Sequence, residues 1–332
     1  MINDQVPFDI PVVLFIFKRA ETTIKTISIL RKIKAKKIIL VSDFGRTQDE
    51  CVVVESVREQ VLRSIDWDCN VEKIFATKNE GVFNQIGLGA YEILNREERA
   101  IFLEDDNLPE ESFFYYCKEL LKKYDLDPKV LWICGTNYLG QYKPKEDVSY
   151  VFTKQLLPCG WASWGHKFCK YYDKTLDFLD NNQEIKKLKC QYVLSALFRQ
   201  QVEEAKDERE RYKKGKRFSS WDYHMIMSLV HNDLYGIAPV FNQIKNTGMD
   251  ANATHGGTSN KNVMANRLCG MESYEMLFPL KHPKAVSVDP KFELLISKMR
   301  LKPFAYRMKR RIKKIIKKIL RKDIDDPIRR QR

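Results

Sequence analysis

In the first hundred residues, short apolar runs alternate with longer stretches whose apolar residues recur at helical spacing. Continuous apolar runs of this length are typical of parallel strands that are buried on both faces. The stretches between them place apolar residues on one side of a helix. Repeated strand–helix–strand units predict a doubly wound, mostly parallel α/β sheet. The predicted strands are 11–17, 36–42, 71–77 and 99–105.

The strict alternation ends after Pro109, so the predicted architecture of the second half is mixed. Segment 203–217 carries too many charges to be buried on every face. Its composition fits an exposed helix end followed by a loop, or a mobile loop beside a ligand. The other elements expected in this half are a helix near 111–124, a strand at 129–136, a helical stretch near 184–206 and a helix start within 219–230.

The 332-residue chain has a formal net charge of +14, which first suggests a nucleic-acid-binding protein. The excess lies in residues 298–322, which contain thirteen Lys and Arg and no acidic residue. Subtracting these thirteen from +14 leaves +1 for the rest of the chain. The basicity therefore belongs to a tail, and specific binding of nucleic acid is not expected.

No apolar run approaches the roughly 20 residues that a spanning helix needs. Residues 1–13 lack the basic start and the apolar stretch of a signal peptide. Eight cysteines are scattered from Cys51 to Cys269 with no CxxC pair. We therefore expect a cytoplasmic protein whose thiols are reduced and lie mostly in the core.

Three consecutive acids, Glu104, Asp105 and Asp106, follow the last predicted strand of the first half. In an open α/β sheet, ligands bind beyond the carboxyl ends of the strands. Adjacent carboxylates repel one another, and a divalent cation such as Mn²⁺ or Mg²⁺ relieves that repulsion through oxygen ligands. The acids would equally suit the start of the helix that follows Pro109.

Other polar residues follow the first three strands. Arg19 and Arg46 suit a diphosphate, because guanidinium groups pair with phosphate oxygens, although surface ion pairs would also use them. Asp43 suits a base or a ribose, or else the cap of the next helix. Asn79 lies beside Gly81 after the third strand. We predict that all four contact a nucleotide donor.

Three further segments contain candidate residues. Trp161 and Trp164 lie among glycines, and together with Trp221 they suit the wall of a sugar site or the core. Asp222 stands at a predicted helix start, as a general base or as a partner of the helix dipole. His255 lies in a loop of small residues that suits closure over a ligand, although a lone histidine is usually structural.

These motifs, in this order, resemble the GT-A family of nucleotide-sugar transferases, especially N-acetylglucosaminyltransferase I and related bacterial enzymes of surface-polysaccharide assembly. The resemblance spans roughly residues 11–258 and is most specific in IFLEDDNLPEESFFYYCKELLKKYDLDPKVLWICGTN, at 101–137, followed by GWASW and SWDY. The chain has Glu-Asp-Asp where the family's more general motif is Asp-x-Asp. Residues 165–220 match nothing in the family, which leaves the acceptor open.

The resemblance implies a fold and a reaction. The fold would be GT-A-like, with residues 1–110 as the nucleotide-sugar-binding half and 111–295 as the acceptor-side half of one catalytic domain. The reaction would be metal-dependent transfer of a sugar from a nucleotide diphosphate, expected to be a UDP-sugar, to a glycan or lipid-linked glycan. Asp106 would bind Mn²⁺ or Mg²⁺, with Glu104 and Asp105 orienting metal and donor.

The same resemblance assigns the remaining roles. Arg19 and Asp43 match positions that hold the nucleotide, and His255 resembles a late histidine that approaches the metal or the diphosphate. Asp222 matches the acid that acts as base. We therefore expect an inverting single displacement in which Asp222 takes the proton of the attacking hydroxyl.

Three other functions remain open. A sugar nucleotidyltransferase shares the sheet and the metal but would carry a Gly-rich loop with Lys or Arg after the first strand, which KRAETT at 18–23 lacks. A glycosidase needs two carboxylates that flank a bond and no nucleotide. A non-enzymatic, membrane-associated sugar-binding protein would bind the donor without turnover.

The third predicted region is a basic tail at 296–332. Within 302–322, apolar residues fall in an arc of about 120° at about 100° per residue, and most Lys and Arg occupy the remainder. This pattern predicts a helix that lies on an anionic membrane surface and holds the protein at the inner face of the membrane. A tail that binds nucleic acid nonspecifically, or packs on the enzyme's own body, fits the same pattern.

Overall fold

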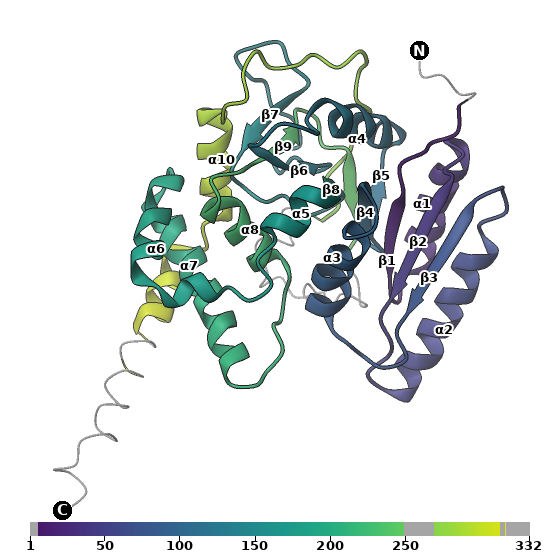
Figure 1. The fold of residues 1–332 in the computed structure, drawn as a ribbon, viewed down its shortest axis with the longest axis horizontal. Helices are drawn as coiled ribbons and strands as arrows, with labels where there is room; N and C mark the ends of the chain where they lie inside the picture. The colour runs from purple at the N-terminus through teal and green to yellow at the C-terminus, as the bar shows by residue number, and fades with distance from the viewer. Residues whose placement is uncertain (1–5, 249–268, 313–315, 317–332) are drawn as a thin grey trace, which may run out of the picture.

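Eight strands form one sheet in the computed structural model of the chain, which describes residues 6–248, 269–312 and 316. Their order is β3-β2-β1-β4-β8-β6-β9-β7, and only β8 and β7 run against the other six. The predicted doubly wound, mostly parallel sheet with a mixed second half is thus confirmed (Figure 1). The strands are β1 Val12–Ile16, β2 Lys37–Ser42, β3 Asn70–Phe75, β4 Arg99–Glu104, β6 Val130–Cys134, β7 Tyr150–Thr153, β8 Trp161–Trp164 and β9 Tyr235–Pro239.

A second, two-stranded sheet joins distant parts of the chain. β5 (Asn107–Pro109) follows the acid triplet and pairs antiparallel with β10 (Ile244–Asn246). In this pairing Asn107 lies opposite Asn246. The small sheet therefore brings the end of β9 and the following loop to the carboxyl end of β4.

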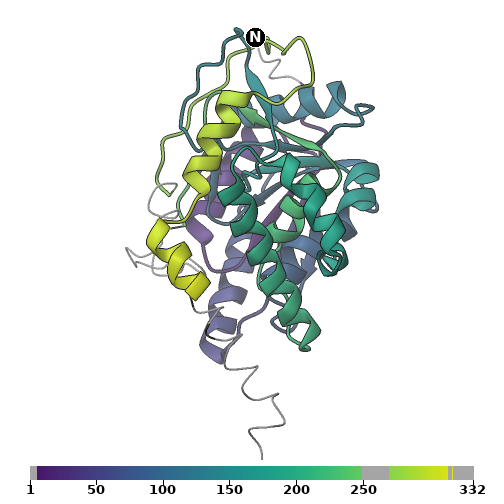
Figure 2. The same ribbon diagram turned by 90° about the vertical axis from the view of Figure 1, so that its left-hand side faces the viewer.

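Helices cover both faces of the large sheet (Figure 1 and Figure 2). Apolar residues of α1, α2 and α4 pack on one face, and those of α3, α5, α7, α8 and α10 pack on the other. Short π- and 3₁₀-helical turns occur at Phe83–Leu88, Asp177–Asp180 and Lys189–Gln191. The α-helices are α1 Ala20–Lys32, α2 Gln48–Arg63, α3 Gly89–Leu94, α4 Glu111–Lys123, α5 Gly165–Tyr171, α6 Asn182–Leu188, α7 Ser195–Lys213, α8 Asp222–His231 and α10 Pro290–Arg300.

Two predicted elements differ from the structure. β3 is not buried on both faces, because it is an edge strand, and Ile74 is 38% exposed. The single helical stretch near 184–206 is divided into α6 and α7 by an extended turn at Tyr192. The turn redirects the chain so that Leu188 and Leu197 both reach the same core.

The eight cysteines are all free thiols, as predicted, but most do not lie in the core. Cys117 and Cys134 are buried, Cys190 is exposed and the other five are half-buried. The half-buried thiols lie in loops, at helix ends or on helix sides, where part of the side chain reaches solvent.

The C-terminal part of the described chain is attached to the body. α10 continues through position 296, where the tail was expected to begin, and Ile296 is fully buried. Residues 304–312 form a further helix, and we call residues 302–310 the tail root. Ion pairs from Lys302 and Arg310 to Glu204 hold it beside α7 (Figure 1). Among residues 6–248, 269–312 and 316, no helix combines the length and the apolar character needed to cross a membrane.

Candidate active site

Parallel strands β1, β2 and β4 end at one edge of the sheet, and Asp105 ties two of these ends together. Its Oδ2 accepts hydrogen bonds from the backbone N–H groups of Phe17 (3.1 Å), Lys18 (3.2 Å) and Arg19 (3.3 Å). Its Oδ1 accepts one from Arg19 Nη1 at 2.9 Å. Asp105 therefore fixes the loop after β1 and orients the predicted phosphate-binding Arg19.

The two acids that flank Asp105 are buried among like charges. Burial, reinforced by the charge of Asp105, raises the pKa of Asp106 to about 6, with Arg19 opposing. Burial also raises the pKa of Glu104 well above its usual range, and the charges of Asp106, Asp105 and Asp222 add to that effect. The cluster therefore favours either a bound proton or a further cation.

Two asparagines that the sequence analysis missed position Asp106. Asn107 is buried, and its Nδ2 donates to Asp106 Oδ1 at 2.6 Å. Asn246, opposite Asn107 in the small sheet, also hydrogen-bonds the Asp106 carboxylate, which lowers the pKa of that group against the larger effect of burial. Asn246 lies 140 positions further along the chain, and no local sequence signal connects the two.

Gly248 allows the chain after β10 to approach this carboxylate. A Cβ atom at that position would lie 2.3 Å from Asp106 Oδ2, which is far inside any van der Waals contact. A side chain at position 248 would therefore displace the Asp106 carboxylate from its place. Thr247 donates its backbone N–H to the Asp106 carbonyl at 2.8 Å and fixes the same approach.

Asp222 comes to the acid cluster from the other half of the sheet. It is the first residue of α8, and its carboxylate accepts a hydrogen bond from Ser220 Oγ. Its charge contributes to the raised pKa of Glu104, which places the two carboxylates within electrostatic range. Two residues on, His224 Nδ1 lies 2.7 Å from the Asp173 carbonyl and anchors the start of α8. The structure thus brings together the two acidic motifs of the predicted site.

Asp43 and Asn79 also come together, at the ends of β2 and β3. Asp43 accepts hydrogen bonds from the backbone N–H groups of Phe44 (2.8 Å), Glu80 (2.8 Å) and Gly81 (2.9 Å). Asn79 Nδ2 donates to Asp43 at 3.1 Å and to the Phe44 carbonyl at 2.8 Å. Both side chains therefore shape the loops at this edge, and their contact with a nucleotide stays a prediction.

Arg46 lies at the rim of this edge, with its side chain 52% exposed. Its Nε and Nη2 donate to the two oxygens of Glu50, at 2.9 and 2.6 Å. These bonds hold the pKa of the Glu50 carboxyl well below its usual range. The predicted contact between Arg46 and a diphosphate would replace or extend this ion pair.

The loop between α7 and α8 crosses to the edge where β2 and β3 end. Arg217 Nη1 donates to the carbonyls of Asn79 at 2.9 Å and Glu80 at 3.0 Å. Arg217 ends the charged segment 203–217, and no role for it could be predicted from the sequence. The structure shows that it links the two predicted halves of the site.

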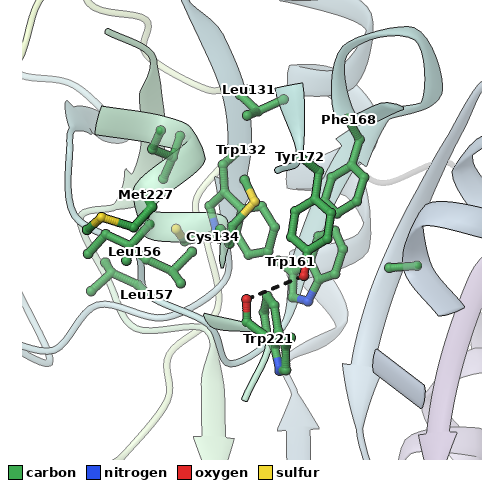
Figure 3. Close-up of a cluster of buried hydrophobic side chains, with 14 of the residues drawn as sticks. Leu131, Trp132, Cys134, Leu156, Leu157, Trp161, Phe168, Tyr172, Trp221 and Met227 are labelled. Atoms are coloured by element: carbon green, nitrogen blue, oxygen red, sulfur yellow. Dashed lines mark hydrogen bonds between the residues drawn. The ribbon is translucent and has the colours of Figure 1, made fainter. Parts of the chain in front are cut away.

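Trp161 and Trp164 are core residues, which corrects their prediction as walls of a sugar site. The indole of Trp161 is stacked between the rings of Phe102 and Trp132, at centroid distances of 3.9 and 4.1 Å, so both of its faces are covered. Figure 3 shows Trp161 beside Trp132. Trp164 points to the opposite face of the sheet, is fully buried, and donates its Nε1–H to the Leu121 carbonyl at 2.8 Å.

Trp221, the third tryptophan predicted at the site wall, joins the Trp161 cluster at 5.8 Å between ring centroids. It is 4% exposed, and its carbonyl accepts a hydrogen bond from Tyr172 (Figure 3). No open indole face remains for a sugar, so the wall prediction is wrong for this residue as well. Trp221 instead occupies the N-cap position of α8, directly before Asp222, and its carbonyl accepts the backbone N–H groups of His224 at 3.1 Å and Met225 at 3.2 Å.

The metal prediction is tested by the donors present. Mg²⁺ and Mn²⁺ prefer carboxylate oxygens and usually take one or two from the protein, with phosphate and water completing the shell. Asp106 and Glu104 offer such oxygens under mutual repulsion, and they fit. In the described part of the chain, no three or more His, Cys, Asp or Glu residues group to hold a metal. His255 lies outside the described residues.

Comparisons with known proteins find similarity in structure alone. No model of a known protein family and no curated protein matches the chain. HddC from Yersinia pseudotuberculosis, complexed with GMP-PN, has 13% identity over 52% of this chain and 86% of its own, with a TM-score of 0.34. Mouse xyloside xylosyltransferase 1 has 12% identity over 83% of this chain and 100% of its own, with a TM-score of 0.36.

A third similar structure is glucosyl-3-phosphoglycerate synthase from Mycobacterium tuberculosis, in complex with Mn²⁺, UDP and phosphoglyceric acid. Its identity is 12%, over 48% of this chain and 56% of its own, and the TM-score is 0.29. Likeness at this level assigns no function. The residues at the edge of the sheet therefore have to carry the functional assignment.

Proposed function

We propose that this protein is a metal-dependent glycosyltransferase that moves a sugar from a nucleotide diphosphate, a UDP-sugar, to a hydroxyl of a glycan or lipid-linked glycan. The observation that carries the proposal is the meeting of two acidic motifs at one edge of the sheet. Asp222 contributes to the raised pKa of Glu104, although 118 positions separate the two residues in the sequence. The resemblance of these motifs to the GT-A family supports the same function.

Asp106 is the proposed ligand of Mn²⁺ or Mg²⁺, with Glu104 adding negative charge. A bound divalent ion would stabilise the charge that develops on the leaving diphosphate. Asp105 holds the backbone of the loop after β1 and the Arg19 guanidinium in place, so that Arg19 approaches phosphate oxygens without reorganisation. The His255 contribution to this metal stays a prediction.

Asp222 is the proposed general base. Ser220 Oγ orients its carboxylate by donating a hydrogen bond, and the start of α8 is held by His224 and Trp221. The carboxylate takes the proton of the acceptor hydroxyl while the hydroxyl oxygen attacks the anomeric carbon, and the diphosphate leaves from the opposite side. This single displacement inverts the anomeric configuration and forms no covalent intermediate.

The experiment is a turnover assay of Asp222→Asn after the donor has been found by thermal-shift screening with nucleotide sugars and Mn²⁺. We expect donor affinity to be kept and turnover to fall by roughly 100-fold or more, because proton transfer contributes only in the transition state. Asp66→Asn is the matched control, since that acid precedes β3 at the other edge of the sheet and is 60% exposed.

The products separate this function from its alternatives. Loss of donor affinity with unchanged turnover per bound donor would make Asp222 a binding residue, and a retained anomeric configuration would exclude the single displacement. Pyrophosphate release from a nucleoside triphosphate and a sugar phosphate would identify a nucleotidyltransferase instead. Donor binding without any product would identify a binding protein.

We also propose that the tail contacts an anionic membrane surface at the inner face of the membrane. The support is the orientation of the described part of its helix. Arg310 is directed to acids on α7, whereas Phe304, Ile312 and Ile316 are 69%, 51% and 50% exposed. Apolar side chains that face away from the body suit burial in a bilayer interface.

A further inference from the structure

A cavity of about 570 Å³ lies between α7, the start of α8 and the tail root. Its volume falls within the range of about 300–1,000 Å³ that is typical of small-molecule sites. Neither the acid cluster after β4 nor the loops after β1, β2 and β3 contribute to it. The lining residues are Glu204, Asp207, Glu208, Tyr223, Lys302, Tyr306, Lys309 and Arg310.

The walls of the cavity are held by interactions between α7 and the tail root. Glu204 is 9% exposed and pairs with Lys302 Nζ at 2.6 Å and Arg310 Nη1 at 3.3 Å. Gln200 Nε2 donates to the Arg300 carbonyl at 3.1 Å, and Gln200 Oε1 accepts the Lys302 N–H at 2.9 Å. The tail root therefore forms one wall of the cavity and is held there by these bonds.

The candidate general base Asp222 does not line the cavity, but its neighbour in the sequence does. Tyr223 lines the cavity and directly follows Asp222 at the start of α8. Burial raises the pKa of Tyr223, and the charges of Asp222, Glu204 and Glu208 act in the same direction. One phenol therefore lies within electrostatic range of both the base and the acids of the cavity wall.

The chemistry of the lining indicates the class of ligand. Three carboxylates and three cations line the cavity, so its wall is close to neutral and favours a neutral ligand over a phosphate. Lys302 Nζ lies over the Tyr306 ring, 5.2 Å from its centroid, and Tyr306 is 50% exposed. The exposed part of the ring offers an aromatic surface on which the C–H groups of a sugar ring can pack. Carboxylates accept, and Lys and Arg donate, the hydrogen bonds of sugar hydroxyls.

We propose that this cavity is the acceptor site and that it takes an uncharged sugar, with the tail root as one of its walls. The inference rests on the proposed glycosyl transfer. It adds the chemical class of the acceptor, which is the second substrate, and the place where the acceptor binds. It follows that the acceptor site is incomplete in a chain that lacks residues 302–310. The basic stretch after Ile312 is not required for it.

The test compares the intact chain with chains that end at Ile312 and at Leu301. Each is saturated with UDP and Mn²⁺, and binding of methyl glycosides and disaccharides of glucose, galactose, mannose and N-acetylglucosamine is followed by saturation-transfer NMR. We expect the chain ending at Ile312 to bind sugar as the intact protein does. The chain ending at Leu301 should bind it at least about tenfold more weakly, because one wall is missing.

Point variants keep the test valid if the shorter chain folds poorly. Tyr306→Ala should weaken sugar binding by about tenfold, the loss expected for one aromatic face, with UDP binding unchanged. Phe304→Ala is the matched control, because Phe304 belongs to the same helix, is 69% exposed and does not line this cavity. Its sugar affinity should equal that of the intact protein.

Two results would overturn the acceptor site: no sugar of the panel binds the intact chain, or Tyr306→Ala and the chain ending at Leu301 bind sugar as tightly as the intact protein does. Binding of UDP in the same samples separates this failure from that of the proposed function. If UDP binds but the sugar results differ from those expected, the proposed acceptor site is wrong and the proposed function still stands. If the intact chain does not bind UDP with Mn²⁺, the proposed function itself fails.

Discussion

Asp105 and Asp106 are neighbours with opposite environments. Asp105 accepts hydrogen bonds from three backbone N–H groups and from Arg19, so both of its oxygens have partners within the protein. Asp106 is buried beside that charge, and its pKa is raised to about 6. Within the acid triplet, Asp105 therefore holds the surrounding backbone in place. Burial raises the pKa of Glu104 and of Asp106 and so opposes their ionisation.

This difference predicts how stability depends on pH. Because the pKa of Asp106 rises from 3.8 to about 6 on folding, the folded state binds the proton more tightly, and the free energy of unfolding should fall as pH rises between these values. Mn²⁺ requires the ionised carboxylate, so the rise in Tm caused by Mn²⁺ should grow from pH 5 to pH 7.5. Thermal scans in EDTA and in Mn²⁺ measure both trends.

Asp106→Asn serves as the control, since it removes this titrating group and should make both trends smaller, while Glu104, whose pKa is also raised, still titrates. A rise in Tm from Mn²⁺ that is equal at pH 5 and pH 7.5, or larger at pH 5, would contradict the assignment of the ion to this carboxylate.

At the residue scale, the charged residues of the candidate site could be predicted from the sequence, but the residues that contact them could not. Asp106 and Asp222 were identified because acids after a strand or at a helix start are conspicuous. Asn246 and Gly248 were missed, because their relation to Asp106 exists only through the pairing of β5 with β10. Trp161 was misassigned, since a stacked core indole and an exposed one look alike in sequence.

At the scale of elements, burial decided what could be predicted. β1, β2 and β4 lie in the interior of the sheet, and their sequences are nearly continuous apolar runs. Their bounds were therefore predicted to within about a residue at each end. β8 was not predicted, because its four residues carry too short a pattern and its partners lie in β4 and β6, far away in the sequence. The position of β8 between β4 and β6 therefore depends on contacts between segments that are distant in the sequence.

Lys167 joins three elements at the far side of this sheet. It is 6% exposed, and its Nζ donates to the carbonyls of Tyr124, Asp127 at 2.8 Å and Val130 at 3.0 Å. Burial lowers the pKa of Lys167 to about 8. Its charge therefore links the end of α4 to the start of β6.

We predict that Lys167→Met lowers the free energy of unfolding by about 2 kcal/mol or more, because buried carbonyls lose their donor. Urea unfolding measures the change. Lys170→Met, on the same helix α5 but exposed, is the matched control and should change stability by less than about 0.5 kcal/mol. Equal effects of the two variants would show that the hydrogen bonds from the Lys167 ammonium to the three carbonyls do not stabilise the fold.

At the scale of the whole molecule, one sheet carries both halves of the candidate site, and the tail is attached beside it. β4 pairs with β8 across position 110, and α10 packs its Phe292 and Ile296 into the main core. A tail that starts from this packed base would hold the candidate site in a defined orientation at a surface.

We predict salt-sensitive binding of the intact chain to vesicles that contain anionic lipid, and loss of that binding in a chain ending at Leu301. Each basic residue near such a surface contributes about 1 kcal/mol, and the apolar side chains add burial. Co-sedimentation with neutral and with anionic vesicles at several salt concentrations measures both effects. Equal sedimentation of the two chains, or none by either, would contradict the membrane proposal.

The most direct test of the central claim is calorimetric titration of UDP into the intact chain and into Asp106→Asn, each with Mn²⁺ and with EDTA. We expect Mn²⁺-dependent binding by the intact chain and by Asp66→Asn, and no Mn²⁺-dependent binding by Asp106→Asn. The cooperative unfolding of Asp106→Asn should persist, because a ligand carboxylate is not needed for packing. Binding of UDP by Asp106→Asn with the affinity and the Mn²⁺ dependence of the intact chain would contradict the central claim.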